Sequence, residues 1–597
     1  MPSVEFYQQR AKQFQEEVSR IESTIRHYSI SRLVVALSVI ALVYLGFTQS
    51  ALFYPIPLLV ILFFFLVQRQ LKYEKERELL LHLVNLNQWE AAATDYDFKN
   101  FPDGERFVDP HHPFSHDLDV FGKGSLFQYI NRCATTLGEN KLGKDLTNLK
   151  FSKESVLQRQ EAIRELGSLV DFRQHCWAIG KQIHDKDFNL EPLWAWLKEP
   201  ALFRGKKFFS VIRWVLPALT CLSLFGILFN PIFKSIFLFL FLTQLGITSA
   251  YNKPITKLQN GLSMYKIILE NYSRIFQLMK AQSCTSSVMK YHVQTATEAA
   301  AHVKKFSELV NAIESRMNLI ARVFGNGLFL YDFHTVINLE QWRAQHTSSL
   351  SSWLESLAEW DALLSFATLH YNQPAYAFAE INEGLTITGK EIGHPLINSS
   401  ERVANNFDLG NPASVMLITG ANMAGKSTFL RTIGVNYILA LNGSPVCATQ
   451  WSCSLATLRT GMRTSDSLQE HQSYFYAELN RLQSIIEDLR AGKPMIILLD
   501  EILKGTNSTD KQKGSRELIK QLIQQKALVL LATHDIALGD MEQQYPDRIV
   551  NTCFEGKIEN DQLTFDYKLN QGLAQKANAT FLMRKMGIIP ASNLNFQ

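Results

Sequence analysis

One short segment, residues 415–428, constrains the fold more than any other part of this 597-residue chain. Aliphatic and β-branched residues lead into the pattern Gly420-x-x-x-x-Gly425-Lys426-Ser427, and a helical pattern follows. A glycine-rich turn between a buried strand and a helix N-terminus is the setting of the phosphate-binding loop. The segment therefore predicts an α/β unit that holds a nucleoside triphosphate.

The chemistry of such a loop assigns roles to its residues. The glycines let backbone N–H groups point at phosphate oxygens, and the helix N-terminus adds partial positive charge. Lys426 can reach the β- and γ-phosphates, and the Ser427 hydroxyl can ligate Mg²⁺. The alternative, a chance glycine-rich turn, is disfavoured by the chemistry further along the chain. The expected ATP ligands are Gly420, Ala421, Asn422, Met423, Ala424, Gly425, Lys426, Ser427 and Thr428.

Two later apolar strands end in polar residues of the kind that ATP hydrolysis requires. Residues 494–501 form an apolar run that ends in Asp500 and Glu501. Asp500 can hold Mg²⁺ and Glu501 can polarise the attacking water. Two solvated acids are the alternative, which fits poorly with the apolar run before them. Residues 528–535 form another such strand, in which His534 can sense the γ-phosphate or orient the water. A lone histidine at a strand end is more often structural, but the order of the motifs favours the functional role.

Two strongly apolar blocks, residues 33–67 and 214–248, interrupt an otherwise polar chain. Each is about 35 residues long, too long for one membrane span and about right for two short ones. We expect two helical hairpins and thus four transmembrane helices. Buried core helices, or one long span per block, are the alternatives, but runs such as residues 61–66 lack the polar face of a core helix.

Basic residues flank both blocks, whereas the presumed turns hold only Lys234. The positive-inside rule then places both termini, and the chain between the hairpins, in the cytosol. We therefore expect a multi-pass protein of the cytoplasmic (inner) membrane. The flanking basic residues are Arg26, Arg32, Arg69, Lys72, Lys75, Arg77, Arg204, Lys206, Lys207, Arg213, Lys253 and Lys257.

Length and composition indicate several folded units in a reducing compartment. The chain is too long for one core, and a net charge of +4 gives no globally basic surface. The seven cysteines are scattered and form no Cys-x-x-Cys pair, which argues against disulfides or zinc. The expected units are a stalk with a hairpin (1–100), a helical core in two parts (101–209 and 250–380), a second hairpin (210–249) and an ATPase domain (381–597).

Several extended motifs resemble those of the MutS family, the ABC-type ATPases of DNA mismatch repair. Thr419-Gly-Ala-Asn-Met-Ala-Gly-Lys-Ser-Thr-Phe-Leu-Arg431 is similar to that family's long phosphate-binding loop. The segment from Arg459 through Ser473 to Glu478 resembles its signature segment, and Ala532-Thr-His534 resembles its switch histidine. Upstream, Phe121 to Gly138 and Leu357 to Ala367 look like parts of its helical core.

The resemblance implies a fold, a cofactor set and an assembly. The fold is a C-terminal α/β ABC-type P-loop ATPase domain, preceded by a mainly α-helical core and here by two transmembrane hairpins. The family uses ATP with Mg²⁺ in a dimer, and its signature serine reaches the nucleotide held by the partner subunit. By position, that residue is Ser473. The expected sites thus combine one subunit's Lys426, Ser427, Asp500, Glu501 and His534 with the other subunit's Ser473.

Departures from the family pattern bear on function. We expect membrane helices in place of the family's amino-terminal mismatch-reading domain, and we interpret the match of Phe378-Ala-Glu380 to its wedge as chance. The stretch from Tyr251 to Asp361 is short for long levers plus a DNA clamp. His471 stands where the signature commonly has glycine, and Ala421 and Ala424 replace a proline and a glycine.

Three functions follow from these features. The first is a membrane-anchored MutS-like ATPase that acts as a homodimer on DNA. The second is a mechanical ATPase that acts on a protein or membrane partner without DNA. The third, a transporter, is disfavoured because the apolar blocks hold almost no polar residues. Helical-domain lysines could contact DNA phosphates, although a solvated charged face is the commoner reason for such a scatter. They are Lys141, Lys144, Lys150, Lys153, Lys304 and Lys305.

Overall fold

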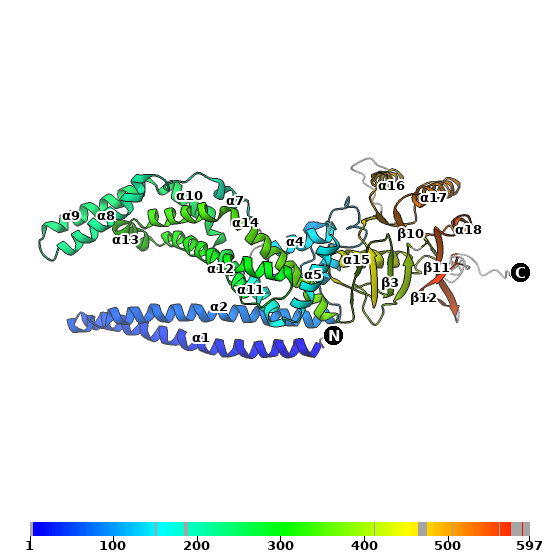
Figure 1. Cartoon of the computed structure of the whole chain (residues 1–597). Helices are drawn as coiled ribbons and strands as arrows, with labels where there is room; N and C mark the ends of the chain where they lie inside the picture. The colour runs from blue at the N-terminus through cyan, green and yellow to red at the C-terminus, as the bar shows by residue number, and fades with distance from the viewer. Residues whose placement is uncertain are drawn as a thin grey trace.

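The computed structural model shows a long helical part joined to an α/β domain (Figure 1). It describes residues 4–149, 152–183, 189–410, 412–463, 474–503, 505–559, 562–574 and 588. Helices make up the chain as far as Asn372, and the first strand begins at Ala377. A mostly helical region followed by an α/β domain, as expected, is therefore confirmed.

Four described helices are long and apolar enough to cross a membrane, judged by length and composition. They form two antiparallel pairs: α1 (Val4–Gly46) with α2 (Ile56–Thr94), and α8 (Lys207–Gly226) with α9 (Ile232–Ala250). A short 3-10 helix, η1 (Ser50–Phe53), joins the first pair. The apolar stretches carry exposed large side chains, which a core helix would bury. In Figure 1 both turns point to the same end, away from the α/β domain.

The helical body consists of shorter elements around one very long helix. They are η2 (Glu105–Phe107), α3 (Leu126–Ile130), α4 (Thr136–Thr147), α5 (Lys153–Gly167), α6 (Val170–Lys181), α7 (Glu191–Lys198), α10 (Asn252–Ser263), α11 (Tyr265–Lys280), α12 (Ser287–Glu314), η3 (Ser315–Met317), α13 (Leu319–Phe329) and α14 (Tyr331–Asn372). With 42 residues, α14 is about 63 Å long at the usual helical rise.

At its first turn, α14 is bound to the base of the second hairpin by aromatic rings. Phe333 is fully buried, and its ring centroid lies 4.7 Å from that of Phe203 and 5.5 Å from that of Phe209. Tyr251, which ends α9, joins the same cluster at 5.7 Å from Phe333. Edge-to-face and tilted contacts at these distances are the favourable arrangements for aromatic rings. The hairpin is therefore fixed to the start of α14.

About three turns before its C-terminal end, α14 carries the buried carboxylate of Asp361. Its Oδ1 accepts a hydrogen bond from Ala134 N at 2.8 Å, and its Oδ2 accepts from Thr135 N at 2.8 Å and Thr135 Oγ1 at 2.7 Å. Gly138 is required beside it, because a Cβ there would lie 2.2 Å from Asp361 Oδ2. Burial raises the pKa of Asp361 to about 6. This contact fixes the start of α4 on α14.

The last turn of α14 holds the first hairpin. Asn372 Oδ1 accepts a hydrogen bond from Tyr7 Oη at 2.5 Å, and Asn372 Nδ2 donates to Glu90 Oε2 of α2 at 3.1 Å. Glu90 also forms a buried ion pair with Arg132, at 2.6 Å from Nε. Both hairpins are thus attached to the same helix, one at each end.

The α/β domain is built on a six-stranded mixed sheet. Its order is β12-β11-β5-β10-β9-β8, in which only the β12 edge is antiparallel. The strands are β5 (Val415–Gly420), β8 (Thr457–Gly461), β9 (Met495–Asp500), β10 (Ala527–Thr533), β11 (Ile549–Glu559) and β12 (Gln562–Gln571).

Helices cover both faces of this sheet. Met416 and Ile418 of β5 pack in the core that includes α15 (Lys426–Leu441), whereas Val415 and Leu417 pack with α16 (Tyr474–Arg490) and α17 (Ser508–Ile523). A strand buried on both faces reads as a continuous apolar run, which explains the pattern before the glycine-rich loop. A short 3-10 helix, η4 (Ile536–Asp540), and a short α-helix, α18 (Met541–Gln544), follow β10.

Two smaller sheets lie beside the main one. One has the order β2-β7-β3-β4, with β2 (Glu380–Asn382), β3 (Ile387–Ile392), β4 (Asn405–Leu409) and β7 (Gln450–Ser454). The other pairs β1 (Ala377–Phe378) with β6 (Pro445–Val446). Phe378 therefore belongs to a strand, in keeping with the view that its match to a mismatch-reading wedge is chance.

The Asp361 contact yields a stability prediction. In Asp361→Ala, three buried donors lose their acceptor, so we expect a loss of about 3 kcal/mol in the free energy of unfolding. The measurement is the thermal unfolding midpoint of the full chain in detergent. Glu355→Ala, an exposed acid on the same helix, is the control. Equal midpoints for the two variants would contradict this role.

The raised pKa of Asp361 yields a pH prediction. The folded chain holds the Asp361 proton up to about pH 6, whereas the unfolded chain releases it near pH 4. This contribution to stability is therefore full below about pH 4 and is lost as pH rises through about 6. The unfolding midpoint of the wild type, relative to that of Asp361→Asn, should fall across this window. A constant difference would show that the carboxyl does not titrate there.

Candidate nucleotide-binding site

The glycine-rich loop connects the central strand β5 to α15, and its backbone needs both glycines. Gly420 has φ +149°, and a Cβ there would lie 2.6 Å from Phe554 O. Gly425 has φ +107°, and a Cβ there would lie 3.2 Å from the Tyr567 ring. Met423 is also left-handed, at φ 68°, whereas Ala421 and Ala424 are not. The two alanine replacements are thus compatible with the loop.

Lys426, the first residue of α15, is directed back into the loop. Its side chain is buried, and Nζ donates to Gly420 O at 2.8 Å and to Ala421 O at 2.9 Å. Nζ also lies 3.4 Å from His534 Nε2. An ammonium group held at the mouth of a helix N-terminus is positioned to bind phosphate oxygens. Ser427 and Thr428 are exposed beside it.

The carboxyl ends of β9 and β10 bring the predicted acids and histidine to the same place. Both strands run parallel to β5, and β10 lies between β9 and β5. Glu501 has φ 55°, and its Oε1 lies 2.6 Å from His534 Nε2. Asp500 ends β9 and is partly exposed. The structure therefore places Lys426, Asp500, Glu501 and His534 at one edge of the sheet.

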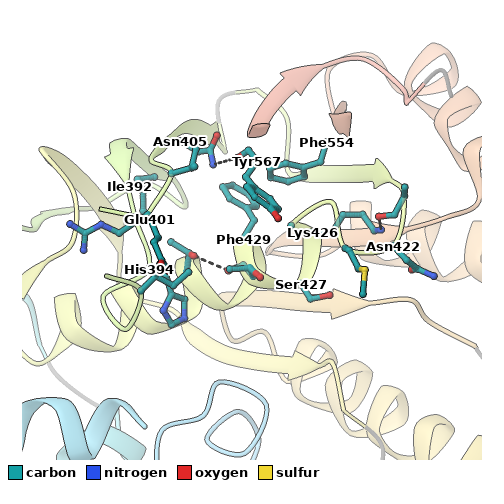
Figure 2. A pocket seen from close by; sticks show the side chains of 18 of the residues that line it. Ile392, His394, Glu401, Asn405, Asn422, Lys426, Ser427, Phe429, Phe554 and Tyr567 are labelled. Carbon is teal, nitrogen blue, oxygen red and sulfur yellow. Dashed lines mark hydrogen bonds between the residues drawn. The ribbon is translucent and has the colours of Figure 1, made fainter. Parts of the chain in front are cut away.

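A cavity of about 390 Å³ opens beside the loop (Figure 2). The glycine-rich loop, Lys426 and Glu501 form one part of its lining. The other part has apolar and aromatic side chains together with Glu401 and Arg402, and comes from β3, β4, the segment between these strands, α15, β11 and β12. Those residues include Ile392, His394, Ile397, Asn405, Phe429, Phe554 and Tyr567. A polar end for phosphates and an aromatic end for a base is the lining that a nucleotide needs.

At the aromatic end of the cavity, Asn405 joins two strands and His394 forms part of the lining. Asn405 Nδ2 donates to Tyr567 O at 3.0 Å (Figure 2). Its Oδ1 accepts from Leu569 N at 2.8 Å, so β4 is bound to β12. Burial, with a smaller effect of the nearby Arg431 cation, lowers the pKa of His394 to about 4. Its imidazole is therefore neutral near pH 7.

Sequence reasoning missed part of this lining. Ile397, Asn405, Phe429 and Phe554 were not expected to line the site, because they come from four separate segments that only the fold assembles. The place of Tyr567 in the cavity follows from the pairing of β12 with β11. No local pattern marks these residues as ligands.

Oxygen donors suit Mg²⁺ at this edge. The Ser427 hydroxyl and the Asp500 carboxylate are hard oxygen ligands, and Mg²⁺ at nucleotide sites takes few protein ligands and completes its shell with phosphates and water. No cluster of three or more His, Cys, Asp or Glu side chains that could hold a metal occurs among the described residues. The donor set thus fits Mg²⁺ bound together with a nucleotide.

The signature segment lies next to this site but is described only in part. Ser473 and His471 fall outside the described residues. Beyond that gap, Glu478 of α16 accepts a hydrogen bond at Oε1 from Leu503 N at 2.6 Å, which joins α16 to the segment after Glu501.

Two aspartates of the helical part hold the segment before the gap. Asp117 is fully buried, and its carboxylate accepts from Thr460 Oγ1 at 2.7 Å and from Met462 N at 3.0 Å. Asp119 bridges Arg431 of α15, at 2.8 Å, and Arg463, at 2.6 Å. Helix α15 and the chain from β8 to Arg463 are therefore both bound to the short segment that holds Asp117 and Asp119.

Comparison with known proteins agrees with this geometry. Residues 416–594 match the family model "MutS domain V". The chain belongs to the MutS family. It is 30% identical to "DNA mismatch repair protein MutS" of Thermotoga maritima over 249 residues, 41% of this chain and 30% of that protein. It is also 30% identical to "MutS protein homolog 4" of Mus musculus over 258 residues, 42% of this chain and 26% of that protein.

A longer match extends into the helical part. The chain is 24% identical to "DNA mismatch repair protein msh3" of Aspergillus fumigatus over 534 residues, 78% of this chain and 46% of that protein. The chain thus matches less than half the length of each of these relatives. Its likeness to the MutS family therefore includes helices before domain V as well as the sheet.

The position of Lys426 yields a binding prediction. Removing its charge-assisted contacts to phosphate in Lys426→Ala should weaken the binding of a fluorescent ATP analogue about tenfold to a hundredfold, since such contacts contribute about 1.5–3 kcal/mol. Lys513→Ala, an exposed lysine on α17, is the matched control. Unchanged affinity in Lys426→Ala would place the phosphates elsewhere.

Proposed function

We propose that this chain is a membrane-anchored MutS-type ATPase that binds ATP with Mg²⁺ and hydrolyses it as a homodimer. The observation that carries the proposal is the contact between Glu501 and His534, 2.6 Å, next to the Lys426 ammonium. A carboxylate and an imidazole at the carboxyl edge of a parallel sheet, facing a glycine-rich loop, are the groups that positioned phosphoryl transfer to water requires.

Each residue has a distinct part in hydrolysis. Lys426 and the loop N–H groups hold the β- and γ-phosphates, and Ser427 with Asp500 holds Mg²⁺, which supplies charge neutralisation at the phosphates. Glu501 orients a water and accepts its proton as the water oxygen bonds to the γ-phosphorus. The bond from that phosphorus to the bridging oxygen breaks, and ADP leaves with the electron pair. His534 fixes the Glu501 carboxylate for this step.

The dimer follows from family resemblance. Ser473 directly precedes α16, whose Glu478 contacts the segment after Glu501. In the proposed dimer, Ser473 completes the nucleotide site of the partner subunit, and ATP closes the two ATPase domains on each other.

The apolar hairpins support anchoring in the cytoplasmic membrane. Apolar side chains along these helices are exposed, and Leu37, Ile61, Leu222 and Phe239 are each at least 57% accessible. Exposing so large an apolar surface to water is unfavourable, whereas a bilayer would cover it. Since both turns lie at the end away from the sheet (Figure 1), one bilayer can accept both hairpins. The ATPase domain then lies in the cytosol, in accord with the flanking basic residues.

We propose that the ATPase acts on DNA, because the relatives named above carry mismatch-repair names. A specific observation favours the second candidate, an ATPase that acts on a protein or membrane partner. Several helical-domain lysines are occupied by carboxylates: Lys141 by Asp145 at 2.5 Å, and Lys305 by Glu308 at 3.6 Å. Lys153 also lies 3.8 Å from the Glu383 carboxylate. Lys150 falls outside the described residues.

The role of Glu501 yields a kinetic prediction. Glu501→Gln should bind ATP with nearly unchanged affinity yet hydrolyse it at least about a hundredfold more slowly, the usual scale for a lost general base. The measurement is phosphate release by the full chain in lipid nanodiscs. Glu517→Gln, an exposed acid on α17, is the control and should keep the wild-type rate. Wild-type turnover by Glu501→Gln would remove the proposed base.

The choice of load yields a salt-dependence prediction. If DNA is the load, duplex affinity should fall at least about tenfold between about 50 and 200 mM salt, because phosphate contacts release counterions. Binding would be measured with a labelled duplex and the chain in nanodiscs, with empty nanodiscs as the control. Absence of binding at the lowest salt would reject DNA and leave the second candidate.

A further inference from the structure

The apolar helix α13 lies between α12 and α14, the two long helices that we call the arm. Unlike the four long helices, it has only 11 residues, about 16 Å, and is too short to cross a bilayer. It nevertheless exposes the large apolar side chains of Leu319 (62%), Ile320 (70%), Phe324 (57%) and Phe329 (53%), and Met317 just before it is 79% exposed. All residues from Asn318 to Arg322 are exposed, so the first half of α13 projects from the molecule.

The second half of α13 is seated on the second hairpin. Gly327 is buried against α9, where a Cβ would lie 2.2 Å from the Phe241 ring. Gln244 Nε2 of α9 donates to Gly327 O at 3.1 Å and to Thr220 Oγ1 of α8 at 2.6 Å. The Phe324 ring lies 6.3 Å from Phe241. α13 lies beside α8 and α9 (Figure 1), so its exposed apolar side chains adjoin those of the second hairpin.

Hydrogen bonds and a buried ion pair fix the N-terminal end of α13. Arg316 is buried and contacts Asp332 Oδ2 at 2.8 Å and Asn252 Oδ1 at 2.8 Å. Asn318 caps the helix by accepting from Ile320 N at 3.0 Å, and Leu330 reverses the chain into α14 at φ 47°. These contacts give α13 a fixed position between α12 and α14.

The contact of α13 with Gln244 of α9 indicates how deep α13 would lie in a bilayer that the second hairpin crosses. Gln244 lies seven residues before Tyr251, which belongs to the aromatic cluster at the hairpin base; this is about 10 Å along the helix. Interfacial helices lie about 5–10 Å into the boundary between headgroups and acyl chains. Arg322 is the one exposed cation in the described stretch from Ser315 to Leu330. Its stem can extend along apolar surface while its head reaches the headgroups.

We infer that α13 is an interfacial membrane helix, whose exposed apolar side chains enter the same phospholipid leaflet through which the second hairpin passes. This inference rests on the proposed anchoring of that hairpin. Because α13 is joined to α12 through η3 and to α14 at Leu330, it attaches these two helices to the bilayer surface in addition to the anchoring by the hairpins.

Depth-dependent quenching tests the inference in the full chain. Cys221 is exposed and Cys284 is partly exposed, so both are first replaced by serine; the other five cysteines are buried. A single cysteine at position 320 is labelled with an environment-sensitive fluorophore, and the protein is reconstituted in phosphatidylcholine–phosphatidylglycerol vesicles. Nitroxides are carried either at the headgroup or along the acyl chain of the lipid.

Two matched positions serve as controls. Phe239 on α9 is 69% exposed and lies within a candidate span, whereas Tyr291 near the start of α12 is 58% exposed and lies far along the arm. We expect the label at 320 to lose emission most strongly with shallow nitroxides, the label at 239 with deeper ones, and the label at 291 with neither. Phe324→Glu should reduce quenching at 320, because a charge opposes entry into the bilayer.

Each other outcome is decisive. Quenching at 239 without quenching at 320 overturns the inference and leaves the membrane anchor intact, even if the label at 320 is shielded, since a protein partner or second copy then covers α13. Absence of quenching at 239 as well overturns the anchor and the inference together. Equal quenching at 320 and 291 shows non-specific adsorption and also overturns the inference.

Discussion

The continuity of α14 is the constraint on which the rest of the structure depends. This single helix of 42 residues meets the second hairpin through Phe333 and the first hairpin through Asn372. Between these points Asp361 fixes α4 to the same helix. Because both apolar hairpins contact α14 directly, a displacement of this helix acts on both of them. This makes the helical part a single lever between the sheet and the end that carries the hairpins.

Near the candidate nucleotide site, two aspartates of the helical part contact the α/β domain. Asp119 binds Arg431 of the loop helix and Arg463 before the signature segment, and Asp117 holds Thr460 and Met462. A nucleotide that shifts the glycine-rich loop relative to the signature segment would strain these contacts. The aspartates thus form a physical route by which the state of the site could reach the arm and, through α13, the bilayer surface.

The local chemistry could be predicted from sequence, whereas the assembled surfaces could not. Lys426, Glu501 and His534 each end a strand or loop with a contiguous pattern, and parallel pairing of β5, β10 and β9 brings such ends together. Asn405 and Phe429 required the tertiary fold, since no local pattern marks them. The role proposed for α13 could not be predicted either, because a helix of 11 residues is too short to be recognised as a span and its contact with Gln244 is long-range. The Ser473 prediction lies outside the described residues.

Accessibility in sealed vesicles tests the central claim, that both hairpins enter one membrane from the side of the ATPase domain. Single cysteines at Gln49 and Asn230, in the two turns, and at Lys513, on α17, would be exposed to a membrane-impermeant thiol reagent, with Cys221 and Cys284 replaced by serine. The account predicts that both turn positions react only in right-side-out vesicles and that position 513 reacts only in inside-out vesicles. Reaction of a turn position and position 513 in the same vesicle orientation would contradict it.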